Sequence, residues 1–164
     1  MNFATFLPDI LAGLISGAGL TYAFFLLREK VFKPLDIDGS WTYDQTTMST
    51  EFKPYEGMVL RYLVLVARTG NTIYGSAEKI YEKNQNEEKP YNGKQRTQVK
   101  ITGHIERNYL GQDKICIHIE EVGKLRNSTT IHILSQEKDG SLTGRFASTI
   151  SNQIGQVTWK KRSS

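Results

Sequence analysis

Three histidines in the C-terminal half of the chain have a spacing that could build a metal site. They are His104, His118 and His132, each fourteen residues after the one before. If they lie on consecutive antiparallel strands with turns near Gly111 and Leu125, the three imidazoles stand side by side on one face. Three histidines with one open position form the catalytic type of zinc site. A solvated sheet face accounts for the same residues, and the sequence identifies no acidic partner for them, so we predict no metal and no other cofactor.

Five aromatic and basic residues form a candidate ligand site. They are Trp41, Tyr43, Arg61, Arg145 and Trp159. Aromatic rings stack on nucleobases, and Arg side chains bind phosphates through paired hydrogen bonds, so this set has the composition of a nucleotide pocket. The same composition describes the end of a small barrel that is closed by packing, and for the two tryptophans we prefer that interpretation.

Motifs that indicate catalysis are absent. The sequence contains no glycine-rich phosphate loop, no H-E-x-x-H motif and no nucleophile elbow, so we predict that the protein is not an enzyme. The single cysteine, Cys116, excludes an internal disulfide and fits a reducing compartment. Lys and Arg outnumber Asp and Glu by 21 to 17, which permits an anionic ligand, but we expect no DNA or RNA polymer as a partner.

The elements that carry these residues differ between the two ends of the chain. The 164 residues, of which 38% are hydrophobic and 23% charged, fit one globular domain and exclude both wholesale disorder and a polytopic membrane protein. Ile10 to Leu27 is an uncharged run of eighteen residues, long enough as a helix to cross the hydrocarbon layer, and no signal-peptide cleavage site follows it. Arg28, Lys30 and Lys33 follow this run, so the positive-inside rule places the remainder in the cytoplasm. We therefore predict a single-pass transmembrane helix within residues 1–33.

One face of this predicted helix carries small residues. Gly13 and Gly17 form a G-x-x-x-G pair, and Thr21 continues the same face by one turn. Such a face lets two membrane helices approach closely. Small residues are also common in membrane helices for other reasons, so self-association through Gly13, Gly17 and Thr21 is one of two interpretations.

After a linker at residues 34–38, residues 39–162 have the pattern of an all-β domain. Eight runs have strand character: Gly39 to Gln45, Val59 to Arg68, Thr72 to Tyr81, Thr97 to Glu106, Lys114 to Glu121, Ser128 to Gln136, Ser141 to Thr149 and Gly155 to Arg162. Short turns between the runs indicate antiparallel neighbours.

Alternation within these runs predicts one buried and one solvated face, which favours a closed eight-stranded meander barrel over an open sandwich. Gly75, Gly103 and Gly144 fall in mid-strand on the inward parity, where they permit sharp coiling. The run from Val59 is apolar on both faces, so either another surface or the segment Met48 to Pro54 should cover it. Residues 82–96 have almost no apolar content and predict a mobile lid or a disordered loop.

This combination of features resembles the membrane-anchored β-barrel effectors of bacterial CBASS antiphage defence. The resemblance rests on the N-terminal membrane segment, the D-x-D-G-x-W stretch at 36–41, and the segments GRF at 144–146 and GQVTW at 155–159. It implies an effector at the bacterial inner membrane whose cytoplasmic barrel binds a cyclic di- or oligonucleotide, then forms a homo-oligomer that disrupts the lipid bilayer. Family members typically have two membrane helices, whereas one is predicted here.

We expect the cyclic nucleotide to enter the barrel mouth, where Arg61 or Arg145 would bind its phosphates. Two other functions fit the same architecture: a membrane-tethered, calycin-like carrier of a small apolar ligand, and a membrane-anchored interaction module. An open apolar lumen would favour the carrier, and a basic, partly polar pocket would favour nucleotide binding.

Overall fold

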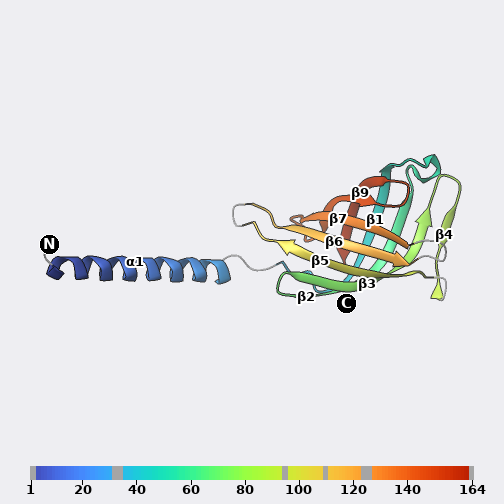
Figure 1. Ribbon diagram of the computed structural model, residues 1–164. Coiled ribbons are helices and arrows are strands. Elements are labelled where there is room, and N and C mark those ends of the chain that lie inside the picture. Colours follow the sequence, from blue (N-terminus) through green and yellow to red (C-terminus); the bar gives the residue numbers. More distant parts are fainter. Residues whose placement is uncertain (1–2, 31–34, 94–95, 109–110, 123–126, 163–164) are drawn as a thin grey trace. The chain divides into compact units, whose positions relative to one another are not determined.

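The chain divides into two compact units, Met1–Asp36 and Ile37–Ser164, and each is described by itself. The computed structural model describes residues 3–30, 35–93, 96–108, 111–122 and 127–162 (Figure 1). For residues 3–11, 27–30 and 122 the structure describes the backbone but not the side chains.

The first unit contains one helix, α1, Phe3–Lys30. Large apolar side chains on it are exposed, among them Leu14, Leu20 and Phe24. The polar side chains of the same stretch bond to the helix backbone: the Thr21 hydroxyl donates to the Gly17 carbonyl at 2.8 Å. The helix surface at residues 12–25 is therefore exposed and largely apolar.

Among the described residues, no helix has both the length and the apolar character that a bilayer crossing requires. The transmembrane helix predicted for Ile10 to Leu27 is therefore not confirmed. That prediction extends at both ends beyond 12–26, the part of α1 whose side chains are described.

The second unit is a β-barrel. Its elements are β1 Gly39–Ser49, the 3₁₀-helix η1 Lys53–Tyr55, β2 Val59–Thr69, β3 Thr72–Lys83, β4 Glu88–Pro90, β5 Gln98–Glu106, β6 Lys114–Val122, β7 Asn127–Gln136, β8 Leu142–Ser148 and β9 Gln153–Lys161. The eight long strands are those that alternation in the sequence predicts, with ends that differ by a few residues.

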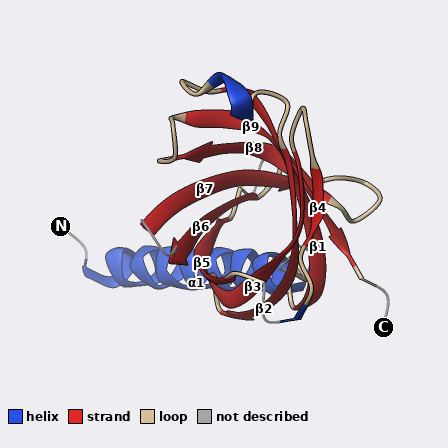
Figure 2. Cartoon of the chain, turned by 90° about the vertical axis from the view of Figure 1, so that its right-hand side faces the viewer, coloured by secondary structure: helices blue, strands red, loops and turns tan. Residues whose placement is uncertain are grey.

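The barrel closes through the pairing of its last strand with its first. Each long strand pairs antiparallel with its neighbour in sequence, β3 pairs with β5, and β9 returns to β1 with Tyr43 opposite Trp159. Figure 2 shows the strands curving around one interior. The predicted eight-stranded meander barrel is thus confirmed, and the open sandwich is wrong, because every long strand has two partners.

The extra strand β4 lies in the segment for which a lid or disorder was predicted. Lys83 pairs with Glu88, and Tyr81 pairs with Pro90, so β3 continues past its pairing with β5 and forms a hairpin with β4. Residues 94–95 lie outside the described residues. The described part of the segment is therefore an ordered extension of the sheet.

The interior is filled by inward side chains from every long strand. Those less than 2% exposed include Trp41, Tyr43, Ile73, Ile101, Ile117, Leu134, Phe146 and Trp159. Glycine is required where coiled strands approach most closely, since a Cβ on Gly144 would lie 1.9 Å from the Ile133 carbonyl oxygen and one on Gly155 would lie 1.9 Å from that of Thr46. The inward mid-strand position predicted for Gly144 is thus confirmed.

The connection between β1 and β2 turns over one end of the barrel. Backbone hydrogen bonds of 2.9 Å join the Thr47 amide to Met58 and the Gly57 amide to Thr47. Leu65, on the outer face of β2, is 63% exposed, so the segment Met48 to Pro54 does not cover it. The connection instead brings Tyr55 to the mouth of the barrel.

Candidate functional site

An aromatic stack occupies the centre of the barrel. The Tyr43 ring lies between Trp159 and Tyr62, at centroid distances of 5.0 and 4.7 Å, with interplanar angles of 20° and 17°. Trp41 packs edge-on against Trp159 at 6.4 Å and donates from its indole nitrogen to the Ile37 carbonyl at 2.8 Å. Both tryptophans are buried and contact protein on their ring faces or edges, in agreement with the packing interpretation.

The structure separates the three histidines that were considered as a metal site. His118 pairs with Ile131 rather than with His132, and His132 pairs with Ile117. This register differs by one residue from the predicted one, and a shift of one residue moves a side chain to the opposite face. His132 is therefore fully buried inside the barrel, while His104 is exposed on the outside. The predicted row of three imidazoles is wrong, and no cluster of metal-ligating side chains occurs among the described residues.

His132 instead belongs to an internal hydrogen-bond chain. The Trp159 indole nitrogen donates to His132 Nδ1 at 3.2 Å, which makes Nε2 the protonated nitrogen. Nε2 then donates to Gln45 Oε1 at 3.3 Å, and this bond directs the amide nitrogen of Gln45 away from the imidazole. Burial lowers the pKa of His132 to about 3, so the ring is neutral near pH 7.

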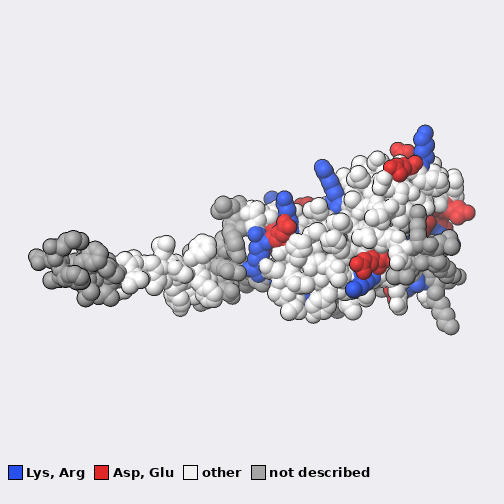
Figure 3. Space-filling view, in the orientation of Figure 1, with Lys and Arg blue, Asp and Glu red and all other residues white. Residues whose placement is uncertain are grey.

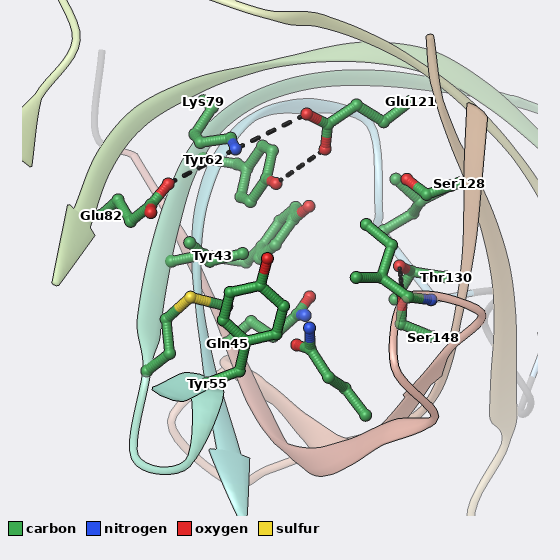
Figure 4. A pocket seen from close by; sticks show the side chains of 15 residues that line it. Tyr43, Gln45, Tyr55, Tyr62, Lys79, Glu82, Glu121, Ser128, Thr130 and Ser148 are labelled. Atoms are coloured by element: carbon green, nitrogen blue, oxygen red, sulfur yellow. Dashed lines mark hydrogen bonds and ion pairs between the residues drawn. The ribbon is translucent and has the colours of Figure 1, made fainter. Parts of the chain in front are cut away.

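One end of the barrel contains a cavity of about 120 Å³, the mouth cavity (Figure 4). Its inner end is formed by Tyr43 and Gln45, and Tyr55 lines it from the β1–β2 connection. Hydroxyl groups of Ser128, Thr130 and Ser148 line the opposite wall in Figure 4. The cavity wall thus combines polar groups with apolar side chains such as Met58 and Ile119.

Three charged side chains face the mouth cavity. Lys79 Nζ lies 3.5 Å from Glu121 Oε1 and 3.6 Å from Glu82 Oε2. The Tyr62 hydroxyl donates to Glu121 at 3.1 Å, and the Tyr91 hydroxyl donates to Glu82 at 3.0 Å. One ammonium is therefore shared between two carboxylates, and one formal negative charge remains at this end of the barrel.

A β-bulge puts Glu82 on the same inward face as Lys79. Arg61 pairs with Tyr81 but the next residue, Tyr62, pairs with Lys79, so Ile80 is an extra residue in β3. Without the bulge, Lys79 and Glu82 would lie on opposite faces, because side chains alternate along a strand. The bulge thus assembles the charged part of the mouth cavity.

The Tyr43 hydroxyl opens on the same cavity. The side chain is 1% exposed, and its hydroxyl points into the space below the Glu121 carboxylate in Figure 4. It makes no hydrogen bond to a described residue. The polar side-chain atoms of described residues that are fully closed off from open space all have hydrogen-bond partners. Burial, and next the charge of Glu121, raise the pKa of Tyr43 well above its usual value, so the phenol is protonated.

A second hollow, the outer hollow, lies on the outside of the barrel over β1, β2 and β9. Its volume is about 700 Å³, and its walls contain four cationic side chains and one acidic one. The lining residues are Thr42, Asp44, Thr46, Arg61, Leu63, Ile80, Arg96, Gln156, Thr158, Lys160 and Arg162. By contrast, basic and acidic side chains are interspersed on the barrel face that Figure 3 displays.

Two of the four cations of the outer hollow are paired with carboxylates. Arg61 binds Asp44 through Nε at 2.6 Å and Nη2 at 2.8 Å, and this bond to Asp44 raises the pKa of Arg61. Arg96 donates to Glu78 at 2.9 Å. With these pairs counted as neutral, Lys160 and Arg162 leave the hollow with a positive charge.

The barrel wall divides the five residues that the sequence suggested for ligand binding. Trp41, Tyr43 and Trp159 lie inside, and only Tyr43 of these lines the mouth cavity. Arg61 lines the outer hollow. Arg145 lies on the outside of the barrel, where it pairs with Gln156, and Gln156 is another lining residue of the outer hollow. Neither arginine therefore reaches the barrel mouth, where a phosphate contact was expected.

Sequence reasoning named Arg61 of the outer hollow and missed the other charged residues of both hollows. Lys79 and Glu121 lie on the inward parity of their strands, so alternation could have placed them, whereas Glu82 was hidden because the bulge at Ile80 leaves no mark in the alternation. Lys160 and Arg162 were visible as a basic run at the end of the last strand. That run was the one signal that pointed to the outer hollow.

Comparisons of the chain with protein-family models, with curated proteins and with solved structures find no match.

Proposed function

We propose that this protein is a membrane-tethered receptor whose barrel binds a cyclic di- or oligonucleotide in the outer hollow. The observation that carries the proposal is the combination of a volume of about 700 Å³ with four cationic side chains and one carboxylate. Sites for small molecules and cofactors usually have volumes of about 300–1,000 Å³. Arg and Lys side chains are suited to bind phosphate groups.

The outer hollow suits such a ligand better than the barrel interior does. At about 120 Å³ the mouth cavity is below the usual size, and its two carboxylates against one ammonium disfavour a phosphodiester. The interior also gives little support to an apolar carrier, because aromatic side chains fill its centre and charged groups line its open end.

The helix supplies the proposed tether and the surface for assembly. Exposed large apolar side chains, among them Leu14, Leu20 and Phe24, lie along α1, and contact with a bilayer or with other protein would cover them. A Cβ on Gly13 or Gly17 would meet no described atom within 4 Å, so this face is open to a second helix. Ligand binding drives assembly if the assembled state binds the ligand more tightly. Disruption of the inner membrane, which the CBASS resemblance implies, follows from that assembly.

The direct test is titration calorimetry of the full chain, in detergent micelles, against cyclic dinucleotides and cyclic trinucleotides. We expect saturable binding of at least one of them, weakening as ionic strength rises from about 0.05 M to about 0.5 M. Lys160→Glu and Arg162→Glu should each weaken binding about tenfold, because each replaces an attraction by a repulsion.

Lys100→Glu is the matched control, because it makes the same charge change at an exposed position of β5, outside the hollow. Absence of heat across the whole panel would contradict nucleotide binding. An equal loss of affinity in Lys100→Glu would show that net charge, rather than the hollow, determines binding.

Assembly is tested in the same preparation by chemical crosslinking with and without the ligand. Gly17→Leu should prevent the ligand-dependent oligomer, because the new side chain blocks close helix approach without a clash inside the protomer. Gly19→Leu, which also meets no described atom within 4 Å, is the control on another face of α1. If both variants assemble like the natural chain, the helix face has no part in assembly.

A further inference from the structure

The mouth cavity has the properties of a separate binding site. Its charged residues are well shielded, since the side-chain exposures are 15% for Lys79, 21% for Glu121 and 26% for Glu82. Removing an ionised carboxylate from water costs free energy unless an opposite charge or hydrogen bonds compensate for the lost hydration. Tyr62 and Tyr91 donate one hydrogen bond to each carboxylate, but Lys79 is the one cation among the residues that line the cavity, so one formal negative charge is left for a cationic ligand.

The Tyr43 hydroxyl is an independent sign that a ligand is missing. The side chain is almost completely buried, and its hydroxyl faces the cavity with no hydrogen-bond partner among the described residues. Buried polar groups nearly always have partners. The hydroxyl can donate to, or accept from, a ligand at the inner end of the cavity.

The size of the cavity limits the ligand. A cavity of about 150 Å³ holds one benzene molecule, so a cavity of about 120 Å³ suits a ligand of about six non-hydrogen atoms. Lys79 and the two carboxylates lie near the open end, whereas Tyr43 and Gln45 lie at the inner end. The ligand therefore needs a positive group at one end and a polar group at the other.

We propose that the mouth cavity binds a small organic cation, an amine whose ammonium group lies on the cavity side of the Glu82 and Glu121 carboxylates and bonds to the oxygen atoms that Lys79 does not contact. Its other end carries a hydroxyl or carbonyl that bonds to the Tyr43 hydroxyl. The bulge at Ile80 brings Glu82 to the same cavity as Glu121, and Lys79 contacts one oxygen atom of each carboxylate, at 3.6 and 3.5 Å. This site does not depend on nucleotide binding in the outer hollow.

Three compounds of nearly equal size test the proposal on the full chain in detergent micelles. They are 4-amino-1-butanol, which is a cation, 1,4-butanediol, which is neutral, and 4-hydroxybutanoate, which is an anion. Binding is followed by calorimetry and by tryptophan fluorescence, because the Trp159 ring lies 5.0 Å from Tyr43. We expect the amine to bind at least tenfold more tightly than the diol, and the anion not to bind.

Two variants locate the bound amine. Glu121→Gln keeps the side-chain shape but removes the charge, and should reduce amine affinity about tenfold without changing diol affinity. Glu120→Gln is the matched control, because Glu120 precedes Glu121 on β6 but is exposed on the outer face. If Glu121→Gln does not fold, Glu82→Gln takes its place with the same expectation.

Tyr43→Phe keeps the stacked ring and should weaken the amine and the diol alike. Equal affinity for all three compounds, no saturable binding of any, or an unchanged amine affinity in both Glu variants would overturn the proposal. Lys160→Glu and Arg162→Glu should leave amine binding intact, so a failure of nucleotide binding leaves this result unaffected.

Discussion

The two hollows of the barrel are built by the same strands and have opposite properties. Tyr43 lines the small cavity with two carboxylates and one ammonium, whereas its neighbour Asp44 lines the larger hollow with four cations. β2 divides in the same way, since Tyr62 faces inward and Arg61 faces outward. Residue type alone therefore does not assign a side chain of β1 or β2 to one of the two hollows. The parity of the strand position decides which of the two chemistries it joins.

The largest expected difference between the two faces of β1 is in stability. Tyr43→Ala should lower the free energy of unfolding by about 3–5 kcal/mol, because it removes the middle ring of the aromatic stack and leaves a cavity. Thr42→Ala, one position away and half-exposed, should cost less than about 1 kcal/mol. Urea unfolding followed by circular dichroism measures both, and similar costs would contradict the division into two faces.

Acid should destabilise the inner side of the barrel specifically. The pKa of His132 is about 3 in the folded chain, against 6.5 for an ordinary histidine. The unfolded chain therefore binds this proton at higher pH, so the free energy of unfolding falls as pH drops below about 6.5 and goes on falling to about 3. Between pH 7 and pH 5 the expected contribution is about 2 kcal/mol.

His132→Gln should remove this part of the pH dependence, and unfolding measured at pH 7 and pH 5 tests it. His118→Gln is the control, because His118 pairs with Ile131 on the outer side of the wall. If the natural chain and His132→Gln lose equal stability on acidification, the imidazole is not the group responsible.

The smallest effect is expected from the ion pair in the outer hollow. Asp44→Asn removes the one lining carboxylate and frees Arg61 from its partner. Affinity for a cyclic dinucleotide should rise about threefold, and stability should change by less than about 1 kcal/mol, because the pair is exposed. Calorimetry measures the affinity of the natural chain and of Asp44→Asn for the nucleotide and for 4-amino-1-butanol. Equal changes for both ligands would mean that the two hollows are not independent.

Local patterns in the sequence were sufficient to predict the eight long strands and their antiparallel order. Alternating apolar residues, as at Ile115, Ile117 and Ile119, mark the buried face of a strand wherever they occur, and short turns make neighbours antiparallel. Mid-strand glycines such as Gly144 indicated close strand contact, which the short distance to Ile133 explains. These signals are local, so they need no knowledge of the partner strand.

The candidate sites could be predicted only in part, because their composition depends on register. The row of histidines failed because a turn centre displaced by half a residue moves His132 from the outer face to the core. The bulge in β3 has no counterpart in the apolar pattern, so the inward turn of Glu82 was invisible. Arg61 was recognised as a ligand candidate, but its pairing with Asp44 required the register of two strands.

The sequence by itself determined that a helical segment with an uncharged run of eighteen residues precedes eight strands with one apolar face each. Both properties follow from the periodicity of local backbone structure. Only the tertiary structure decided that the strands close, that a bulge turns Glu82 to the side of Lys79 and Glu121, and that the basic residues gather outside. Closure, register and bulges depend on hydrogen bonds between residues distant in sequence, and a shift of one residue there exchanges the inside of the barrel for the outside.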